Sequence, residues 1–224
     1  MTAIHICFEG TEGCYKTTNA KALAEKLRLL GFSVLETKEP GTVHLPLTMK
    51  LRAIMLDAQY ENEMTRQARE LISQAIRSIH VEKLIEPSRD KYDFIIQDRG
   101  SMSGMAYGMA CGNDYYELER LLSFVGGCMG DYDKIIYLQG DAAAGLKQAT
   151  EAKQEFAAGD AMEARGIEFM ESVEGYFYEL IDQQDNVDII NVLNKSREEI
   201  LDEILQVVLK PLVDSGLLKT IPKT

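Results

Sequence analysis

Five short apolar runs, separated by longer segments with helical spacing, constrain this chain more than any other feature of its sequence. They span 3–9, 32–36, 92–98, 133–139 and 187–192. These runs are too short and too rich in β-branched or aromatic residues for buried helices, and their nearly continuous apolar character suits strands that are covered on both faces. Their alternation with helical segments predicts an α/β fold, a three-layer α/β/α arrangement with a five-stranded parallel sheet.

Three helices can be placed from apolar spacing and end signals. The first runs from Thr17 to Leu30, with Gly31 at the position of a left-handed C-terminal cap. A long amphipathic helix covers 62–86, and we expect Pro87 to end it. Its apolar face carries Ala68, Leu71, Ile72, Ala75 and Ile79, so its polar face is free for function. The last helix starts at a capping box of Ser196 and Glu199, and we expect Pro211 to stop it.

The length of 224 residues and the absence of a Gly/Ser/Pro-rich linker predict a single domain over 1–224. The Ala- and Glu-rich stretch at about 140–165 predicts a small lid-like insert within it.

The net charge of −12 argues against a nucleic-acid polymer or an anionic membrane as partner. It leaves small molecules bound in a local cationic pocket. The four cysteines, Cys7, Cys14, Cys111 and Cys128, have neither a disulfide-framework nor a CxxC spacing, so they predict reduced thiols and no zinc site. With no long apolar segment, we expect a soluble, cytoplasmic protein.

The strongest chemical signal is the segment between the first apolar run and the first helix. It follows the phosphate-binding pattern G-x-x-x-x-G-K-[ST], in which backbone N–H groups and a helix N-terminus face a phosphate. Tyr15 replaces the second glycine of that pattern, and a Cβ there either strains the backbone or crowds a nucleotide. The predicted ATP-binding residues are Gly10, Thr11, Glu12, Gly13, Cys14, Tyr15, Lys16, Thr17 and Thr18. An ordinary strand–turn–helix is the structural alternative.

Further segments extend the pattern. Phe8-Glu9-Gly10-Thr11-Glu12-Gly13 with Lys16-Thr17-Thr18, then Thr37-Lys38-Glu39-Pro40-Gly41, Arg77, His80-Val81-Glu82 and Asp98-Arg99 through Tyr107 occur in this order. In that order and context the chain resembles the thymidylate kinase family of P-loop nucleoside monophosphate kinases. The resemblance covers about residues 3 to 192 and implies transfer of the ATP γ-phosphoryl group to a deoxynucleoside 5′-monophosphate, with dTMP as the expected acceptor.

The resemblance also implies residue roles. Lys16 would serve the donor phosphates, Arg99 would bridge to the acceptor phosphate, and Glu12 would orient Arg99 or the sugar. Thr17 and Asp98 would hold Mg²⁺, with ATP as co-substrate. The implied acceptor-binding residues are Lys38, Glu39, Pro40, Arg52, Ser73, Arg77, Arg99, Ser103 and Tyr107, with Lys38 and Arg52 on the phosphate and Arg77 on the base. Family members are usually homodimers, so the resemblance implies a homodimer.

Three departures from the family keep alternatives open. Tyr15 is one. Ser73 stands where the family usually has a Phe that stacks on thymine, which leaves the acceptor base open. Residues 141–175 carry three cations against eight acidic residues, the wrong sign for a lid that closes over triphosphate. Many bacterial members of the family bring arginines from this lid onto the transferred phosphoryl group, and here Lys147 or Arg165 could take that role. A deoxynucleoside kinase and a nucleotide-binding pseudokinase are the alternatives.

Some of these residues also have plain structural explanations. Asp98 and Arg99 could form an exposed ion pair, Arg69 fits a solvated helix face, and Arg52 could lie along an amphipathic helix. Met102, Met105 and Met109 are predicted to pack in the core rather than take part in chemistry.

Overall fold

A computed structural model describes residues 2–141 and 161–221 of the chain. Five parallel strands form one sheet in the order β2-β3-β1-β4-β5. Their bounds are β1 Ile4–Glu9, β2 Val34–Lys38, β3 Phe94–Asp98, β4 Lys134–Gln139 and β5 Val187–Asn191. The predicted α/β fold with a five-stranded parallel sheet is confirmed. The second strand begins two residues later than expected, because Phe32 and Ser33 belong to the turn after helix α1.

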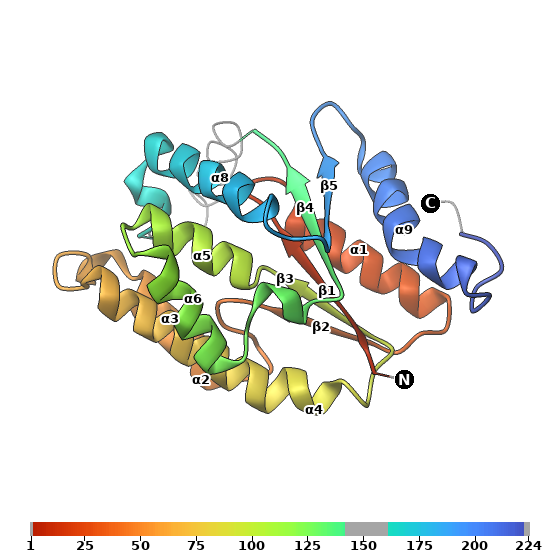
Figure 1. Cartoon of the computed structure of the whole chain (residues 1–224), viewed down its shortest axis with the longest axis horizontal. Helices are drawn as coiled ribbons and strands as arrows, with labels where there is room; N and C mark the ends of the chain where they lie inside the picture. The colour runs from red at the N-terminus through yellow and green to blue at the C-terminus, as the bar shows by residue number, and fades with distance from the viewer. Residues whose placement is uncertain (1, 142–160, 222–224) are drawn as a thin grey trace.

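Helices cover both faces of this sheet (Figure 1). The α-helices are α1 Lys16–Leu29, α2 Pro46–Leu56, α3 Arg66–His80, α4 Glu86–Ser88, α5 Ser101–Ala110, α6 Tyr115–Val125, α8 Ile167–Ile181 and α9 Arg197–Asp214. Short helical turns lie at η1 Ala58–Tyr60, η2 Val81–Ile85, η3 Met129–Asp131 and η4 Glu163–Arg165. Figure 1 places α1 and α9 on one side of the sheet and α5 and α8 on the other.

Side-chain alternation along the central strands divides the core into two layers. Ile6 and Phe8 of β1 face α1 and α9, whereas Cys7 between them faces α5, α6 and α8. Met102, Met105 and Met109 of α5 are buried in the second layer, which confirms their predicted packing role. Because both faces are covered, the carboxyl ends of the strands are left as the open edge where ligands can bind.

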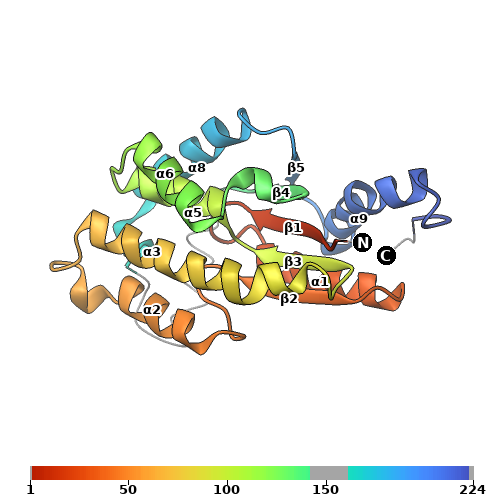
Figure 2. The same ribbon diagram turned by 60° about the horizontal axis from the view of Figure 1, so that its bottom comes forward.

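The long helical segment differs from its prediction at both ends. It begins at Arg66, where the Thr65 hydroxyl accepts a hydrogen bond from the Ala68 N–H, and it does not end at Pro87. A π-helical turn, Val81–Ile85, follows His80, and Pro87 lies directly after it in the first turn of α4, where proline is tolerated. Figure 2 shows α3 and α2 side by side beyond the sheet.

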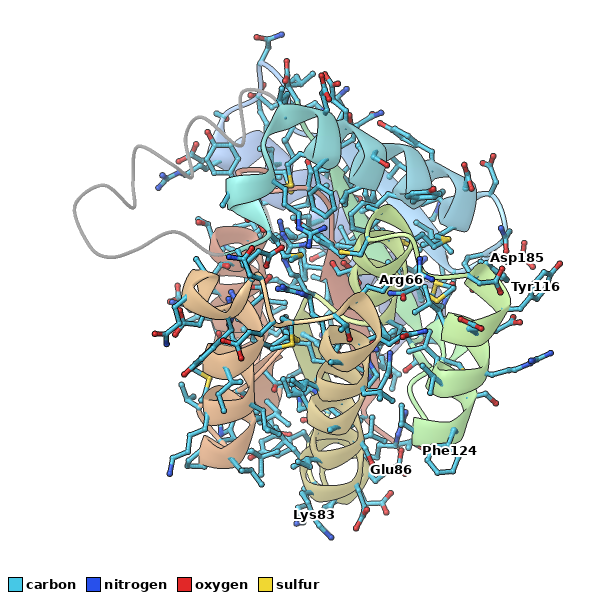
Figure 3. All side chains as sticks on the ribbon, turned by 90° about the vertical axis from the view of Figure 1, so that its left-hand side faces the viewer. Arg66, Lys83, Glu86, Tyr116, Phe124 and Asp185 are labelled. Carbon is cyan, nitrogen blue, oxygen red and sulfur yellow. The ribbon has the colours of Figure 1, made fainter. Side chains whose placement is uncertain are left out.

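The polar face of α3, rather than its apolar face, points into the molecule. Arg69, Glu70, Gln74 and Arg77 are buried, whereas Leu71 is 59% exposed. Figure 3 looks onto this helix, with Arg66 near its upper end and Lys83 and Glu86 at the lower end of the same helical segment. The inward polar face shows that the interior beside α3 is a polar cavity rather than packed core.

The last helix confirms its predicted start and corrects its predicted end. Ser196 and Glu199 form the capping box, with the Glu199 carboxylate 2.7 Å from the Ser196 N–H. Pro211 lies inside α9, which continues to Asp214. The buried side chains of Leu209 and Leu212 hold this last turn against the core despite the lost backbone hydrogen bond.

The predicted lid-like insert lies mostly outside the described residues, and so does Lys147. None of the helices within 2–141 and 161–221 is long and apolar enough to cross a membrane. The four cysteines are free thiols.

Candidate functional site

The turn between β1 and α1 has the backbone that a phosphate-binding loop requires. Gly10 and Gly13 have positive φ angles of 140° and 72°. A Cβ on Gly10 would lie 2.6 Å from the Leu138 carbonyl oxygen, so only glycine fits there. The loop therefore packs closely on the end of β4.

Tyr15 adopts the left-handed conformation, with φ 62° and ψ 24°. Of the two consequences expected from this residue, backbone strain is therefore the one found, at a cost of about 1–2 kcal/mol. Its side chain is 39% exposed. The backbone stays in place because the Tyr15 carbonyl accepts hydrogen bonds from the backbone and side-chain N–H groups of Asn19, each at 3.0 Å.

Lys16 lies at the first position of α1, and its ammonium is buried against its own loop. It donates to the Thr11 carbonyl and lies 3.5 Å from the Cys14 sulfur. The adjacent Thr17 hydroxyl donates to the Asp98 carboxylate at 2.5 Å, while Thr18 is exposed. Lys16 and Thr17 thus face the strand ends, where the outer phosphates of a nucleotide would lie.

Asp98 ends β3 between β1 and β2 and is 5% exposed. Burial raises the pKa of its carboxyl, but the Lys38 ammonium at 3.2 Å and the Thr17 hydrogen bond outweigh burial and hold that pKa below its ordinary value. Within the described residues its Oδ1 is buried without a hydrogen-bond partner. An ionised carboxylate with one unused oxygen beside a threonine hydroxyl is a donor set that suits Mg²⁺.

Arg99 connects the phosphate-binding turn to helix α5. Its guanidinium donates to the Gly10 carbonyl at 3.0 Å, to the Ser103 hydroxyl at 2.9 Å and to the Glu12 carboxylate at 2.6 Å. The guanidinium also lies over the Tyr107 ring, 5.5 Å from its centroid. Asp98 and Arg99 are both buried, so they do not form an exposed surface pair.

Glu9 is a residue of this site that the sequence analysis did not assign. It is fully buried and accepts hydrogen bonds from the Gly100 N–H at 2.9 Å and from both the backbone N–H and the hydroxyl of Ser103. Burial raises the pKa of Glu9, although these hydrogen bonds and the nearby Arg99 oppose that shift. A carboxylate at the end of an otherwise apolar strand was the available signal.

Beside the phosphate-binding turn lies a cavity of about 360 Å³. Every residue that the sequence assigned to acceptor binding lines it: Lys38, Glu39, Pro40, Arg52, Ser73, Arg77, Arg99, Ser103 and Tyr107. The sequence analysis missed other lining residues, namely Met55, Leu56, Arg66, Arg69, Glu70, Gly100, Gly104, Gly108, Cys111, Asn113 and Met162. The lining carries more cations than acids: Lys38, Arg52, Arg66, Arg69, Arg77 and Arg99 against Glu12, Glu39 and Glu70.

Glu39, Arg77 and His80 form a buried network in one wall of the cavity. The Glu39 carboxylate accepts from the Arg77 Nε at 2.9 Å and lies 2.8 Å from the His80 Nδ1. Burial raises the pKa of Glu39, but Arg77 and His80 outweigh it and lower the pKa to about 2. Arg77 also donates to Gln74 at 3.2 Å and to the Gly100 carbonyl at 3.2 Å, so most of its five N–H groups already have partners.

Two other arginines differ in how they sit at this cavity. Arg52 is half-buried, with one guanidinium nitrogen 3.5 Å from the Pro40 carbonyl, and its side chain reaches the cavity rather than only lying along α2. Arg69 is 7% exposed and donates to the Met55 carbonyl and to Glu61, so the expectation of a solvated face was wrong for it. Arg69 is stable in this buried position because the Met55 carbonyl and the Glu61 carboxylate pair with its N–H groups.

Of Lys147 and Arg165, the two cations that could replace lid arginines, only Arg165 lies within the described residues. Its guanidinium pairs with Glu61 at 2.7 Å and lies over the Phe169 ring, 5.2 Å from its centroid. It therefore holds η4 against the segment before α3, and it lies 3.6 Å from the sulfur of Cys111, which lines the cavity.

The parallel sheet, the Gly10–Thr17 turn between β1 and α1, and the cavity beside this turn define the class of P-loop nucleoside monophosphate kinases. Comparisons with known proteins name the family within it. The thymidylate kinase family model matches residues 8–204. A thymidylate kinase of Halothermothrix orenii is 31% identical over 206 residues, which covers 91% of this chain and 95% of the relative.

Other relatives agree with this match. A thymidylate kinase of Geotalea daltonii is 42% identical over 102 residues, and that alignment spans about half of each protein, 46% of this chain and 46% of the relative. The crystal structure of thymidylate kinase from Ehrlichia chaffeensis has the same fold, with a TM-score of 0.72 at 22% identity over 93% of this chain and 99% of that one. The chain belongs to the thymidylate kinase family.

Proposed function

We propose that this protein transfers the γ-phosphoryl group of ATP to a deoxynucleoside 5′-monophosphate in a Mg²⁺-dependent reaction, with dTMP as the first acceptor to test. One observation carries the proposal. Residues from separate segments of the chain line a single cavity beside the phosphate-binding turn, namely Lys38 to Pro40, Arg52, Ser73, Arg77, Arg99, Ser103 and Tyr107. Such a cavity can hold an acceptor phosphate in line with a donor phosphate.

The donor side depends on α1 and the turn before it. Backbone N–H groups of residues 13–17 and the partial positive charge of the helix N-terminus would surround the β- and γ-phosphates. Lys16 would exchange its contacts with Thr11 and Cys14 for phosphate oxygens.

Between donor and acceptor, Arg99 is the cation best placed to contact the transferred group. It is fixed by Gly10 and Ser103, and its partner Glu12 comes from the phosphate-binding turn itself. Because phosphoryl transfer depends mainly on positioning and on charge stabilisation, a guanidinium held in this way contributes without any covalent step. Lys38 and Arg52 would hold the acceptor phosphate.

Thr17 and Asp98 would hold Mg²⁺, through the threonine hydroxyl and the carboxylate oxygen that has no partner among the described residues. When bound, the ion supplies positive charge that neutralises the β- and γ-phosphate oxygens. The low pKa of Asp98 keeps the carboxylate ionised and available at neutral pH.

A coupled ADP-release assay with the four deoxynucleoside monophosphates tests the proposal. We expect turnover that requires ATP and Mg²⁺ and that is lost in Arg99→Met. A protein that folds and shows no turnover with any of the four acceptors would refute it. Phosphorylation of deoxynucleosides, but not of their monophosphates, would instead identify a deoxynucleoside kinase.

A nucleotide-binding pseudokinase is the second candidate, and the strained Tyr15 backbone favours it. If calorimetry found monophosphate binding that does not depend on ATP, together with no turnover, this candidate would replace the kinase.

The proposal includes a homodimer, as the family resemblance implies, and a cytoplasmic location. The exposed apolar residues Leu71 of α3 and Phe124 of α6, 59% and 87% exposed, support self-association. Phe124 projects outward in Figure 3. Sedimentation of the wild-type protein and of Phe124→Asp measures the oligomeric state, and a monomer in both would contradict this part.

A further inference from the structure

Glu9 lies at the carboxyl end of β1, and no role has been given to its carboxylate so far. The side chain is 0% exposed. Its Oε1 accepts hydrogen bonds from the Gly100 N–H at 2.9 Å and from the Ser103 N–H at 3.0 Å, and its Oε2 accepts one from the Ser103 hydroxyl. A buried carboxylate on one strand therefore receives three hydrogen bonds from the start of helix α5.

These hydrogen bonds replace a cap that α5 cannot supply itself. The N-cap residue of α5 is Gly100, which has no side chain. A Cβ at this position would collide with the Tyr132 hydroxyl and would lie 2.9 Å from the Cys7 sulfur, so a capping Ser, Thr or Asp does not fit there. Glu9 accepts the N–H groups that a capping side chain normally satisfies. The cap of α5 thus comes from β1, the strand that leads into the phosphate-binding turn.

Arg99, directly before this cap, has a left-handed backbone with φ 66°. An arginine rarely adopts this conformation, so the surrounding structure must hold it. The Arg99 N–H donates to the Phe8 carbonyl at 2.9 Å, and the next N–H along the chain, that of Gly100, donates to Glu9. Two consecutive residues of β1 therefore hold the Arg99 backbone in the conformation that directs its side chain to the phosphate-binding turn.

The Ser103 hydroxyl links Glu9 to the Arg99 guanidinium. It accepts a hydrogen bond from the Arg99 Nη1 at 2.9 Å and donates its own proton to Glu9. A serine hydroxyl has only one proton to donate, and Glu9 fixes where that proton points. A lone pair of the hydroxyl oxygen therefore stays directed at Arg99.

We infer that Glu9 is a positioning residue for the proposed phosphoryl transfer, on which this inference rests. It caps α5 and, through the Ser103 hydroxyl, holds the Arg99 guanidinium between the phosphate-binding turn and the acceptor cavity, which Arg99 also lines. Because a misplaced cation loses much of its effect on a transition state, removal of this support should slow the transfer more than it weakens acceptor binding.

Glu9→Gln tests the inference with little change of shape. The amide oxygen can still accept the two backbone N–H groups, but an NH₂ group replaces the oxygen that fixes the Ser103 proton. In the coupled assay, with the acceptor that wild-type protein uses best, we expect kcat to fall about tenfold or more. KM for that acceptor should stay within about twofold of wild type, because Lys38 and Arg52 would still hold its phosphate.

Ser103→Ala removes the link itself and leaves the backbone N–H at position 103 to donate to Glu9. It should lower kcat as Glu9→Gln does. The double variant should be no more than about twofold slower than the slower single variant, because both changes break the same connection, whereas independent effects would multiply. Asp133→Asn is the matched control, since this exposed carboxylate accepts the His5 N–H at the other end of β1 and its change should keep the wild-type kcat.

Rotation of the Arg99 guanidinium about its Cζ–Nε bond is a readout that needs no turnover. NMR exchange measurements follow it, with Arg99→Lys to assign the signal. Glu9→Gln and Ser103→Ala should each speed the rotation at least about threefold, because one hydrogen bond fewer holds the group. A role limited to capping α5 would leave the rotation unchanged in both variants.

The inference is overturned if Glu9→Gln keeps kcat within about twofold of wild type, if the losses multiply in the double variant, or if guanidinium rotation does not change. A comparable loss of kcat in Asp133→Asn would also overturn it. Thermal melting shows whether each variant is folded, and if Glu9→Gln is not, Ser103→Ala decides by the same two measurements. If wild-type protein phosphorylates none of the four acceptors, the proposed function fails, and the rotation measurement decides on Glu9 separately.

Discussion

The buried imidazole of His5 should make the stability of this protein depend on pH in a defined window. His5 lies on β1 and is 3% exposed, with its Nε2 2.9 Å from the Gln97 Oε1 and its edge against the Tyr132 ring. Its Nδ1 is buried without a hydrogen-bond partner among the described residues. Burial, aided by the positive charge of Arg89, lowers the His5 pKa from 6.5 to about 4.

The sign follows from where the proton binds. Between pH 6.5 and 4 the unfolded chain protonates His5 and the folded protein does not, so the free energy of unfolding falls as pH falls through this window. The two pKa values give a loss of about 2 kcal/mol between pH 7 and pH 5, and about 3 kcal/mol by pH 4.

Urea unfolding followed by circular dichroism at pH 7, 6 and 5 measures this loss. His5→Gln is the control, because an amide can still donate to Gln97 but does not titrate. Every other titrating group is common to both proteins, so the difference between their pH slopes isolates His5. If the wild-type protein loses no more stability than His5→Gln between pH 7 and pH 5, the reasoning is refuted.

Four other changes test the site and the core. Lys16→Met should lower kcat at least about 100-fold with the melting temperature little changed, because the ammonium acts on phosphates; an unaffected kcat would contradict that role. Tyr15→Gly should raise the free energy of unfolding by up to about 1 kcal/mol, since relief of the left-handed strain exceeds the entropy cost of glycine; urea unfolding would show a decrease if the strain were absent. Glu39→Gln should cost about 3 kcal/mol in the same measurement at pH 7, because it leaves the buried Arg77 charge without its partner, and a loss below about 1 kcal/mol would argue against the network. Met102→Ala should cost about 2–5 kcal/mol by opening a cavity in the second core layer, and a nearly neutral result would mean that the layer collapses around the gap.

The parts of the fold that could be predicted depend on local patterns. Continuous apolar runs such as Phe94 to Ile96 have few alternatives to a buried parallel strand, and the capping box at Ser196 defines a helix start by itself. The ends of helices were harder. Proline prevents a hydrogen bond only at some positions, so Pro87 is tolerated in the first turn of α4 and Pro211 is held by the packing of Leu212.

The residues of the site could be predicted where they belong to a recognisable sequence motif. The acceptor-side residues came from a resemblance between ordered motifs, and they line one cavity in the structure. Burial of polar residues was not predictable, because it depends on partners distant in sequence. Arg69 resembles a surface arginine until Met55 and Glu61 are placed beside it, and Glu9 and Glu70 need Ser103 and Gln74 to explain them.

Arg99 joins the phosphate-binding turn to the cavity beside it. It is held by Gly10 and Glu12 on one side and lines the acceptor cavity on the other. A ligand that draws the guanidinium away from Glu12 in one site must change the free energy of binding in the other, and thermodynamic linkage makes that effect equal in both directions. In the proposed kinase, this one side chain would therefore make the donor and acceptor nucleotides each other's effectors.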